Sequence, residues 1–248
     1  MEIGFKTDKG KMRSNNEDAC FVMQKDRVFI IADGVGGNKS GEIASRTAVK
    51  GIVEYIENNP LDGISSPKKI QEYFDECIKK INLTVLESSQ RFEENRGMAT
   101  TIVVAYIVKN KMYVMNVGDS RAYIFRKHKL RQITEDHTYV NSLVKAGVIT
   151  EEEAEYHENK NMITRAIGAD YKVDADFFVT SIKKNDIILM CTDGLYGEVN
   201  QQDLILKLAE GKPMSDTCYD LIEMANIHGG NDNITVICLK ITEDEIDE

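Results

Sequence analysis

The sequence predicts an α+β fold in which two antiparallel sheets are flanked by helices. Strand-like apolar runs and helical patterns are grouped along the chain instead of alternating one by one, which favours antiparallel sheets over a doubly wound parallel sheet. The 248 residues and their 42% hydrophobic content suffice for one large core. No internal repeat or low-complexity linker divides the chain, so we predict one domain over residues 1–241 and a short acidic tail over 242–248.

The first predicted core element is a strand at residues 28–32, a compact apolar run that ends at Asp33 and Gly34. A helix follows from near Ser40, where apolar residues recur at helical spacing until Pro60 ends the segment.

A second, longer helix begins after Ser66, a suitable N-cap with Pro67 in the first helical position, and its apolar stripe ends before Gly97. Because two amphipathic helices in succession must share one hydrophobic surface, we expect a sheet beneath them. Strand-like runs that supply it occupy residues 100–108, 111–117, 121–126 and 129–134. Asn110-Lys111 and Gly118-Asp119 are turn signals, and they predict an antiparallel meander.

A polar, helical stretch then interrupts the strands from Asp136 to about His157. Thr150 and Glu153 have the spacing of a capping box. We interpret residues 136–160 as a helical flap that lies over the domain surface. The remaining predicted elements are strands at 176–181, 186–191 and 234–241 and helices at 202–209 and 215–227.

Composition limits the possible partners and location of the protein. A net charge of −10 with scattered Lys and Arg argues against a nucleic-acid partner. Five cysteines without close spacing indicate buried thiols in a reducing compartment. The chain has neither a secretion signal nor an apolar run long enough for a bilayer, so we expect a monomeric cytoplasmic protein without membrane insertion.

Short acidic motifs recur along the chain, and several of them adjoin an apolar strand run. They are NED at 16–18, ADG at 32–34, TDG at 192–194 and NDN at 231–233. Singly each is an ordinary turn sequence. Carboxylates gathered at the ends of core strands repel one another, so they are tolerated together only when protonated or when a cation lies among them. Because magnesium and manganese prefer oxygen ligands, the set predicts a divalent metal site.

The order of these motifs resembles that of the PP2C-type (PPM) metal-dependent serine/threonine protein phosphatases, especially the bacterial members. The matching segments are RSNNEDA from Arg13, ADGVGG from Ala32, MATT from Met98, GDSR from Gly118, TRAIG from Thr164, CTDGLYGEV from Cys191 and GGNDNIT from Gly229. The resemblance spans about residues 3–239 and implies a four-layer α-β-β-α sandwich. It also implies two or three Mn²⁺ or Mg²⁺ ions at one end of the paired sheets.

The resemblance further implies a role for each acidic residue. Asp33 would bridge two ions; Asp193 and Asp232 would complete one of them, and Glu17 with the Gly34 carbonyl would serve the other. Asp18 would act by holding metal-bound water, and Asp119 of GDSR would help to hold a third ion. Arg13 would grip the substrate phosphate, a role that suits a planar cationic fork.

The implied reaction is hydrolysis of phosphoserine and phosphothreonine in proteins, opposing a serine/threonine kinase. A metal-activated water would attack phosphorus in line, without a covalent phospho-enzyme. Relatives often carry a histidine near the Asp-Gly pair, where this chain has Val35 and Asn38. His157 in the flap is therefore the candidate general acid, and a solvated flap residue is an equally good interpretation of it.

Two other functions remain open on the sequence. A non-catalytic binding module of the same fold would be expected to lack metal carboxylates, and here Glu17, Asp18, Asp33, Asp193 and Asp232 are all present. A structural calcium site is disfavoured because the carboxylates are dispersed and no EF-hand spacing occurs. The sequence does not identify the phosphoprotein substrates or the metal used in the cell.

Overall fold

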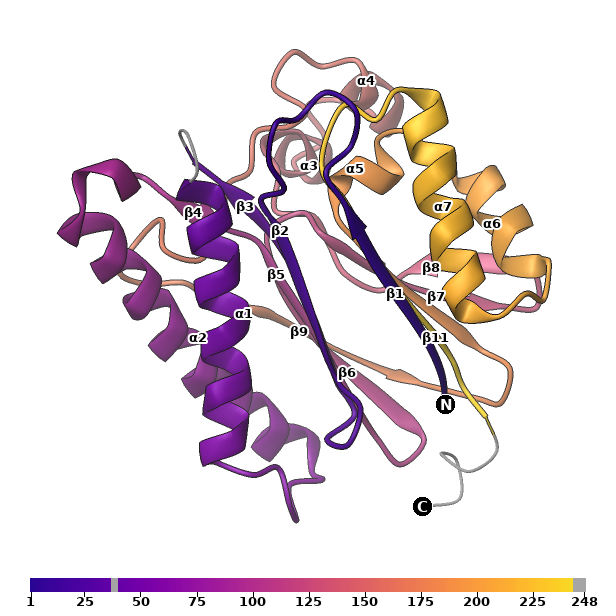
Figure 1. The fold of residues 1–248 in the computed structure, drawn as a ribbon, viewed down its shortest axis with the longest axis horizontal. Coiled ribbons are helices and arrows are strands. Elements are labelled where there is room, and N and C mark those ends of the chain that lie inside the picture. The colour runs from indigo at the N-terminus through magenta and orange to yellow at the C-terminus, as the bar shows by residue number, and fades with distance from the viewer. Residues whose placement is uncertain (37–39, 243–248) are drawn as a thin grey trace.

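Two antiparallel sheets lie face to face at the centre of the molecule (Figure 1). The computed structural model describes residues 1–36 and 40–242. The five-stranded sheet has the spatial order β1 (Glu2–Asp8), β11 (Ile234–Lys240), β10 (Ile187–Cys191), β7 (Arg121–Arg126) and β8 (Lys129–Gln132). The six-stranded sheet has the order β2 (Asp18–Met23), β3 (Val28–Val35), β5 (Ile102–Val108), β6 (Lys111–Val117) and β9 (Asp176–Ser181), with β4 (Ala99–Thr100) paired to β3.

Helices cover the outer face of each sheet (Figure 1). On the six-stranded sheet they are α1 (Ser40–Asn58) and α2 (Pro67–Arg91), which the 3-10 turn η1 (Glu93–Asn95) follows. On the five-stranded sheet they are α5 (Asp193–Tyr196), α6 (Gln201–Ala209) and α7 (Met214–His228). The predicted α-β-β-α sandwich is confirmed.

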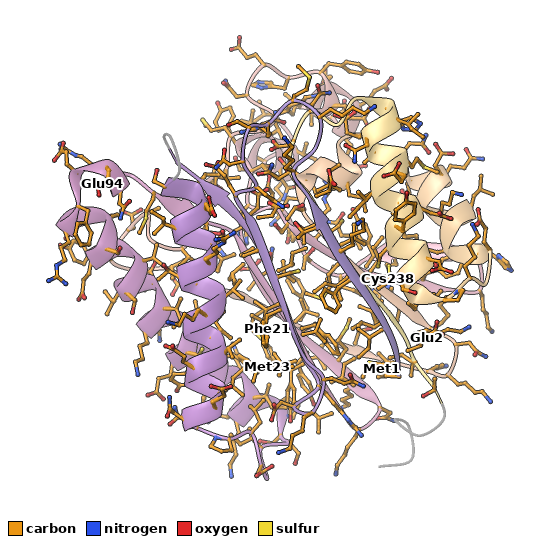
Figure 2. All side chains as sticks on the ribbon, in the orientation of Figure 1. Met1, Glu2, Phe21, Met23, Glu94 and Cys238 are labelled. Carbon is orange, nitrogen blue, oxygen red and sulfur yellow. The ribbon has the colours of Figure 1, made fainter. Side chains whose placement is uncertain are left out.

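Three apolar clusters correspond to the three interfaces between these layers, and side chains fill all of them (Figure 2). Alternation along β3 sorts its residues between two of the clusters. Val28 and Ile30 pack toward α1 and α2, whereas Phe29 and Ile31 pack between the sheets. Asp33 continues the second series, so the same alternation directs it to the side of β3 that faces the other sheet.

Two predicted helix starts are confirmed in detail. The hydroxyl of Ser66 accepts a hydrogen bond from the Lys69 backbone N–H, with Pro67 in the first turn of α2. Thr150 and Glu153 form the predicted capping box at the start of α4 (Glu151–Glu155). With α3 (Tyr139–Lys145), this helix falls inside the predicted flap, between β8 and β9.

The predicted meander is wrong at one turn. Asn110-Lys111 does join the antiparallel pair β5 and β6, but Gly118-Asp119 carries the chain from β6 in one sheet to β7 in the other. Gly118 has φ +102°, and a Cβ there would lie 2.6 Å from Thr101 Cβ. Turn residues alone do not tell a hairpin from a crossing between sheets, since both need the same backbone freedom.

The sequence pattern missed strands β1 and β2, whose side chains are mostly half-buried, and it did not detect the break at Thr101 between β4 and β5. All five cysteines are free thiols, and four of them are buried. None of the helices in residues 1–36 and 40–242 combines the length and apolar character needed to cross a bilayer. Asn38 and tail residues 243–248 lie outside the described residues.

Candidate active site

Two predicted site residues are direct cross-strand neighbours. Asp18 at the start of β2 pairs in register with Asp33 near the end of β3. Asp18 is buried, and its Oδ2 accepts hydrogen bonds from the hydroxyls of Thr192 at 2.9 Å and Thr235 at 2.7 Å. Both threonines belong to segments of the opposite sheet, so one carboxylate links the two sheets at this end of the molecule.

The backbone of Asp33 is held by the two threonines of the MATT motif. The Asp33 N–H donates to Thr101 Oγ1 at 2.9 Å, and the Asp33 carbonyl accepts from the Thr101 N–H and the Thr100 hydroxyl, both at 2.8 Å. A further 2.7 Å hydrogen bond joins the hydroxyls of Thr101 and Ser120. The sequence shows the motif, but it does not show that these threonines hydrogen-bond to the backbone of Asp33.

Glu17 lies against the first turn of α1. A Cβ at Gly41 would be 2.9 Å from Glu17 Oε2, and a Cβ at Gly34 would be 2.0 Å from the Gly41 carbonyl oxygen. Glycine at both positions therefore lets the helix start approach β3 and the Glu17 carboxylate. A carboxylate near a helix N-terminus is favoured by the helix dipole.

Asp193 and Asp232 lie on adjacent segments of the five-stranded half. Asp193 is the first residue of α5, which follows β10, and Asp232 precedes β11. Gly194 permits their approach, because a Cβ there would lie 2.1 Å from the Asn233 carbonyl oxygen.

Asn233 ties the N-terminal loop to this region. Its Oδ1 accepts from the Glu17 N–H at 2.7 Å, and its Nδ2 donates to the carbonyls of Lys9 and Asn15, both at 2.9 Å. Its own N–H donates to Asp232 Oδ1 at 2.8 Å. Asn233 thus fixes Glu17 and Asp232 relative to each other.

Arg13 lies on the exposed rim of the same cluster. Its Nη2 contacts Asp232 Oδ2 at 2.7 Å, and 48% of the Arg13 side chain is exposed. The guanidinium therefore adjoins the acidic cluster while remaining accessible to a ligand from solvent.

Asp119 is buried in the crossing between β6 and β7. Its carbonyl accepts from the Tyr196 hydroxyl at 3.0 Å. The Arg121 guanidinium lies over the Tyr196 ring, with Arg121 Cζ 3.5 Å from the ring centroid. Arg121 also forms an ion pair with Asp136. Arg121 is therefore a structural anchor.

The acidic side chains perturb one another. Burial raises the pKa of Asp18 to about 8, with added repulsion from Asp193 and Asp232 and opposing hydrogen bonds from the threonines. Burial first, then repulsion from Asp18, Asp193, Asp119 and Asp232, raises the pKa of Asp33 well above its ordinary value. The pKa of Asp119 rises to about 7 through burial and the proximity of Asp193 and Asp136, and that of Asp193 rises through burial and Asp232.

The residues fit a divalent cation. Oδ1 of Asp18 and Oδ1 of Asp193 are buried without a hydrogen-bond partner. Unpaired buried carboxylate oxygens are costly unless protonated or bound to a cation. In the described part of the chain, no group of three or more His, Cys, Asp or Glu side chains has the close arrangement of a metal site. The carboxylates are thus mutually repelling neighbours, not side chains already converged on one point.

The contacts of the flap histidine, His157, are made with other flap residues. His157 Nδ1 accepts from the Asn159 N–H at 3.1 Å, and its ring centroid lies 5.9 Å from that of Tyr139. His137 is instead built into the flap base, where its Nδ1 accepts from the Gly118 N–H and its Nε2 contacts Asp176. His137 therefore links the flap to the turn at Gly118 and to β9.

Comparisons with known proteins cover nearly the whole chain. The family model "Protein phosphatase 2C" matches residues 9–234. The serine/threonine phosphatase Stp of Listeria monocytogenes is 35% identical over 243 residues, covering 97% of this chain and 96% of that protein. The solved structure of the S. agalactiae serine/threonine phosphatase superposes with a TM-score of 0.90 at 35% identity, covering 97% of this chain and 99% of the other.

A second solved structure is that of the catalytic domain of the serine/threonine protein phosphatase PstP in complex with two manganese ions. It has a TM-score of 0.84 at 29% identity and covers 97% of this chain and 98% of the other. With the sandwich, the acidic motifs and the family match in agreement, the chain belongs to the protein phosphatase 2C family.

Proposed function

We propose that the chain hydrolyses phosphoserine and phosphothreonine in proteins and so opposes a serine/threonine kinase. The observation that carries this is the junction of Asp18, Asp33, Asp193 and Asp232 from both sheets, with two buried carboxylate oxygens unpaired. Family membership and the names of the relatives support the same reaction.

The proposed ligands are those that the motifs indicate. Asp33 would contribute to both ions; Asp193 and Asp232 would hold one Mn²⁺ or Mg²⁺, and Glu17 with the Gly34 carbonyl would hold a second. Asp119 would help to hold a third ion. When bound, such ions lower the pKa of coordinated water, which supplies the nucleophile, and they offset phosphoryl charge.

The chain's own residues position the substrate. Arg13, exposed at the rim and already in contact with Asp232, is suited to bidentate contact with phosphate oxygens. The hydroxyls of Thr192 and Thr235 orient the Asp18 carboxylate, and Thr100 and Thr101 hold the backbone of Asp33 in place. His157 remains the proposed proton donor to the leaving group; since its Nδ1 accepts a backbone hydrogen bond, Nε2 would have to carry that proton.

The test is turnover of p-nitrophenyl phosphate and a phosphothreonine peptide with and without Mn²⁺ or Mg²⁺. We expect activity only with the metal, and we expect Asp193→Asn to lower kcat at least about a thousandfold, since it removes a ligand essential to the reaction. Asp62→Asn, at an exposed position, is the matched control and should keep full activity. Turnover that persists in EDTA would count against the proposal.

A further inference from the structure

Two adjoining pockets lie on the six-stranded half of the molecule. The larger, about 590 Å³, lies between the C-terminal end of α2 and the loop that follows the flap. The second, about 400 Å³, lies between the end of β3 and residues 163–174. Ala99 and Ala169 line both pockets, so the two pockets adjoin, and together they are called here the α2 trench.

The trench approaches the candidate active site at Val35. This residue lines the second pocket, and 37% of it is exposed. Val35 follows Asp33 by two positions in β3, so both side chains lie on the same face of the strand, about 7 Å apart along it. Ala99 also lines this pocket, two residues before Thr101, whose hydroxyl accepts from the Asp33 N–H.

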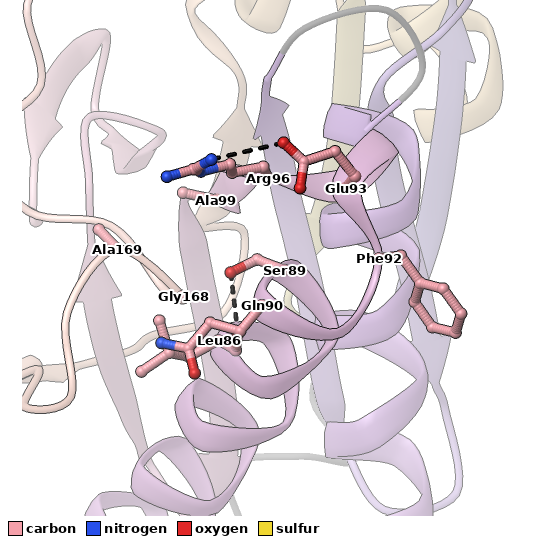
Figure 3. Close-up of a pocket in the computed structure, with 10 residues that line it drawn as sticks. Leu86, Ser89, Gln90, Phe92, Glu93, Arg96, Ala99, Gly168 and Ala169 are labelled. Atoms are coloured by element: carbon pink, nitrogen blue, oxygen red, sulfur yellow. Dashed lines mark hydrogen bonds and ion pairs between the residues drawn. The ribbon is translucent and has the colours of Figure 1, made fainter.

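The trench has a floor of small residues, and its walls combine polar side chains with the apolar Leu86 and Phe92. Figure 3 shows Ala99, Gly168 and Ala169 opposite Ser89 and Gln90 of α2, with Arg96 and Glu93 at one end. Gly168 has φ +86°, and a Cβ there would lie 2.4 Å from Val85 Cγ1, so glycine keeps the floor close to α2. Ala169, Gln90 and Arg96 are exposed, whereas Ala99 and Gly168 are buried.

We propose that the α2 trench holds the polypeptide chain of the substrate on one side of its phosphorylated residue, an inference that rests on the proposed function. A phosphate held at Asp33 and Arg13 leaves the substrate main chain at the rim beside Val35. From there the main chain would follow the two pockets in turn.

The lining suits a peptide backbone. Small floor residues admit a main chain closely, and the Gln90 amide can both donate to and accept from it. The Arg96–Glu93 pair, 80% and 88% exposed, is held weakly and can exchange for contacts with a substrate. A compact small molecule would occupy one of the two pockets, whereas an extended peptide would occupy both.

The test fills the trench from one side. Ala169→Trp introduces a large side chain at an exposed position that borders both pockets. We expect kcat/KM for p-nitrophenyl phosphate to stay within about twofold of wild type. For a phosphothreonine peptide with about six flanking residues on each side, we expect a loss of at least about tenfold, mainly through KM.

Two matched pairs guard against a folding defect. Gln90→Trp obstructs the trench from the opposite wall and should reproduce the loss. Tyr171→Trp, in the same loop as Ala169, and Glu94→Trp, whose side chain points outward in Figure 2, border neither pocket and should match wild type. For peptides extended on only one side of the phosphothreonine, kcat/KM should fall when the extension is on one side and stay unchanged when it is on the other.

The outcomes separate the two proposals. A wild-type protein that hydrolyses neither substrate overturns the proposed function and this inference with it. An active wild type whose Ala169→Trp and Gln90→Trp variants keep full kcat/KM on every peptide overturns the trench alone. The trench proposal is also overturned if both variants lose kcat/KM equally on the peptide and on p-nitrophenyl phosphate while their melting temperatures stay unchanged.

Discussion

At the scale of single residues, Asp18 occupies an environment that is costly for a carboxylate. It is a buried carboxylate with one oxygen held by two hydroxyls from the other sheet and the second oxygen unpaired. The hydroxyls of Thr192 and Thr235 therefore stabilise the fold and orient the site at once.

Replacing Thr235 by valine should show how much its hydrogen bond to Asp18 contributes to stability apart from side-chain packing. The change keeps the shape but leaves Asp18 without its shorter hydrogen bond, at 2.7 Å. Removing a hydrogen-bond partner from a buried polar group costs about 1–3 kcal/mol, and each kcal/mol corresponds to a fall in melting temperature of about 2–4 °C. Thr84→Val, on the exposed face of α2, is the control, and an equal effect of both changes would refute the assignment.

The raised carboxyl pKa values predict how stability depends on pH without metal. Burial raises the pKa of Asp18 to about 8 and that of Asp119 to about 7, against about 3.9 in an unfolded chain. Between about pH 4 and pH 8 the folded state therefore holds more protons than the unfolded state, so the free energy of unfolding falls as pH rises. Melting curves in EDTA check this, and Asp18→Asn should flatten the trend. A melting temperature that rises across the window would contradict it.

At the scale of elements, the site depends on close approach between backbone segments. Gly194 in α5 touches the loop before β11, and Gly34 in β3 touches the start of α1. Each contact brings a carboxylate-bearing segment within reach of the others, and each needs a residue without Cβ.

Gly194→Ala should therefore damage the site although alanine favours a helix. Its Cβ would meet the Asn233 carbonyl oxygen at 2.1 Å, which forces α5 away from the Asp232 loop. We expect a loss of about 1–3 kcal/mol, measured by urea unfolding, and weaker Mn²⁺ activation. Gly51→Ala in α1 meets only the flexible end of Ile81 and should be nearly neutral. Unchanged Mn²⁺ activation in Gly194→Ala would contradict the role given to this contact.

The sequence predicted the elements with strong periodicity and missed those without it. The helices α1 and α2 and the core strands β3 and β10 carry clear apolar patterns. Strands β1 and β2 do not, because their partly exposed side chains weaken the alternation. Acidic motifs beside strand ends, together with the family resemblance, predicted the metal site, whereas the threonines that bond to Asp18 and Asp33 were not predicted, because the role of a hydroxyl depends on long-range pairing.

At the scale of the whole molecule, the two sheets meet at a carboxylate junction. Asp18 and Asp33 come from one sheet, and Thr192, Asp193 and Asp232 from segments of the other. A cation bound there would tie the halves together and relieve their repulsion. By linkage, Mn²⁺ or Mg²⁺ at a hundred times its dissociation constant should add about 2.7 kcal/mol to the free energy of unfolding, or roughly 5–11 °C in melting temperature. The absence of such a shift in differential scanning fluorimetry would argue against the site.

Isothermal titration calorimetry with Mn²⁺ on the wild type, Asp33→Asn and Asp62→Asn tests the carboxylate junction most directly. We predict at least two Mn²⁺ per wild-type chain, an unchanged isotherm for Asp62→Asn, and loss of both strong sites in Asp33→Asn because it would contribute to each. Equal Mn²⁺ binding by wild type and Asp33→Asn would contradict the account.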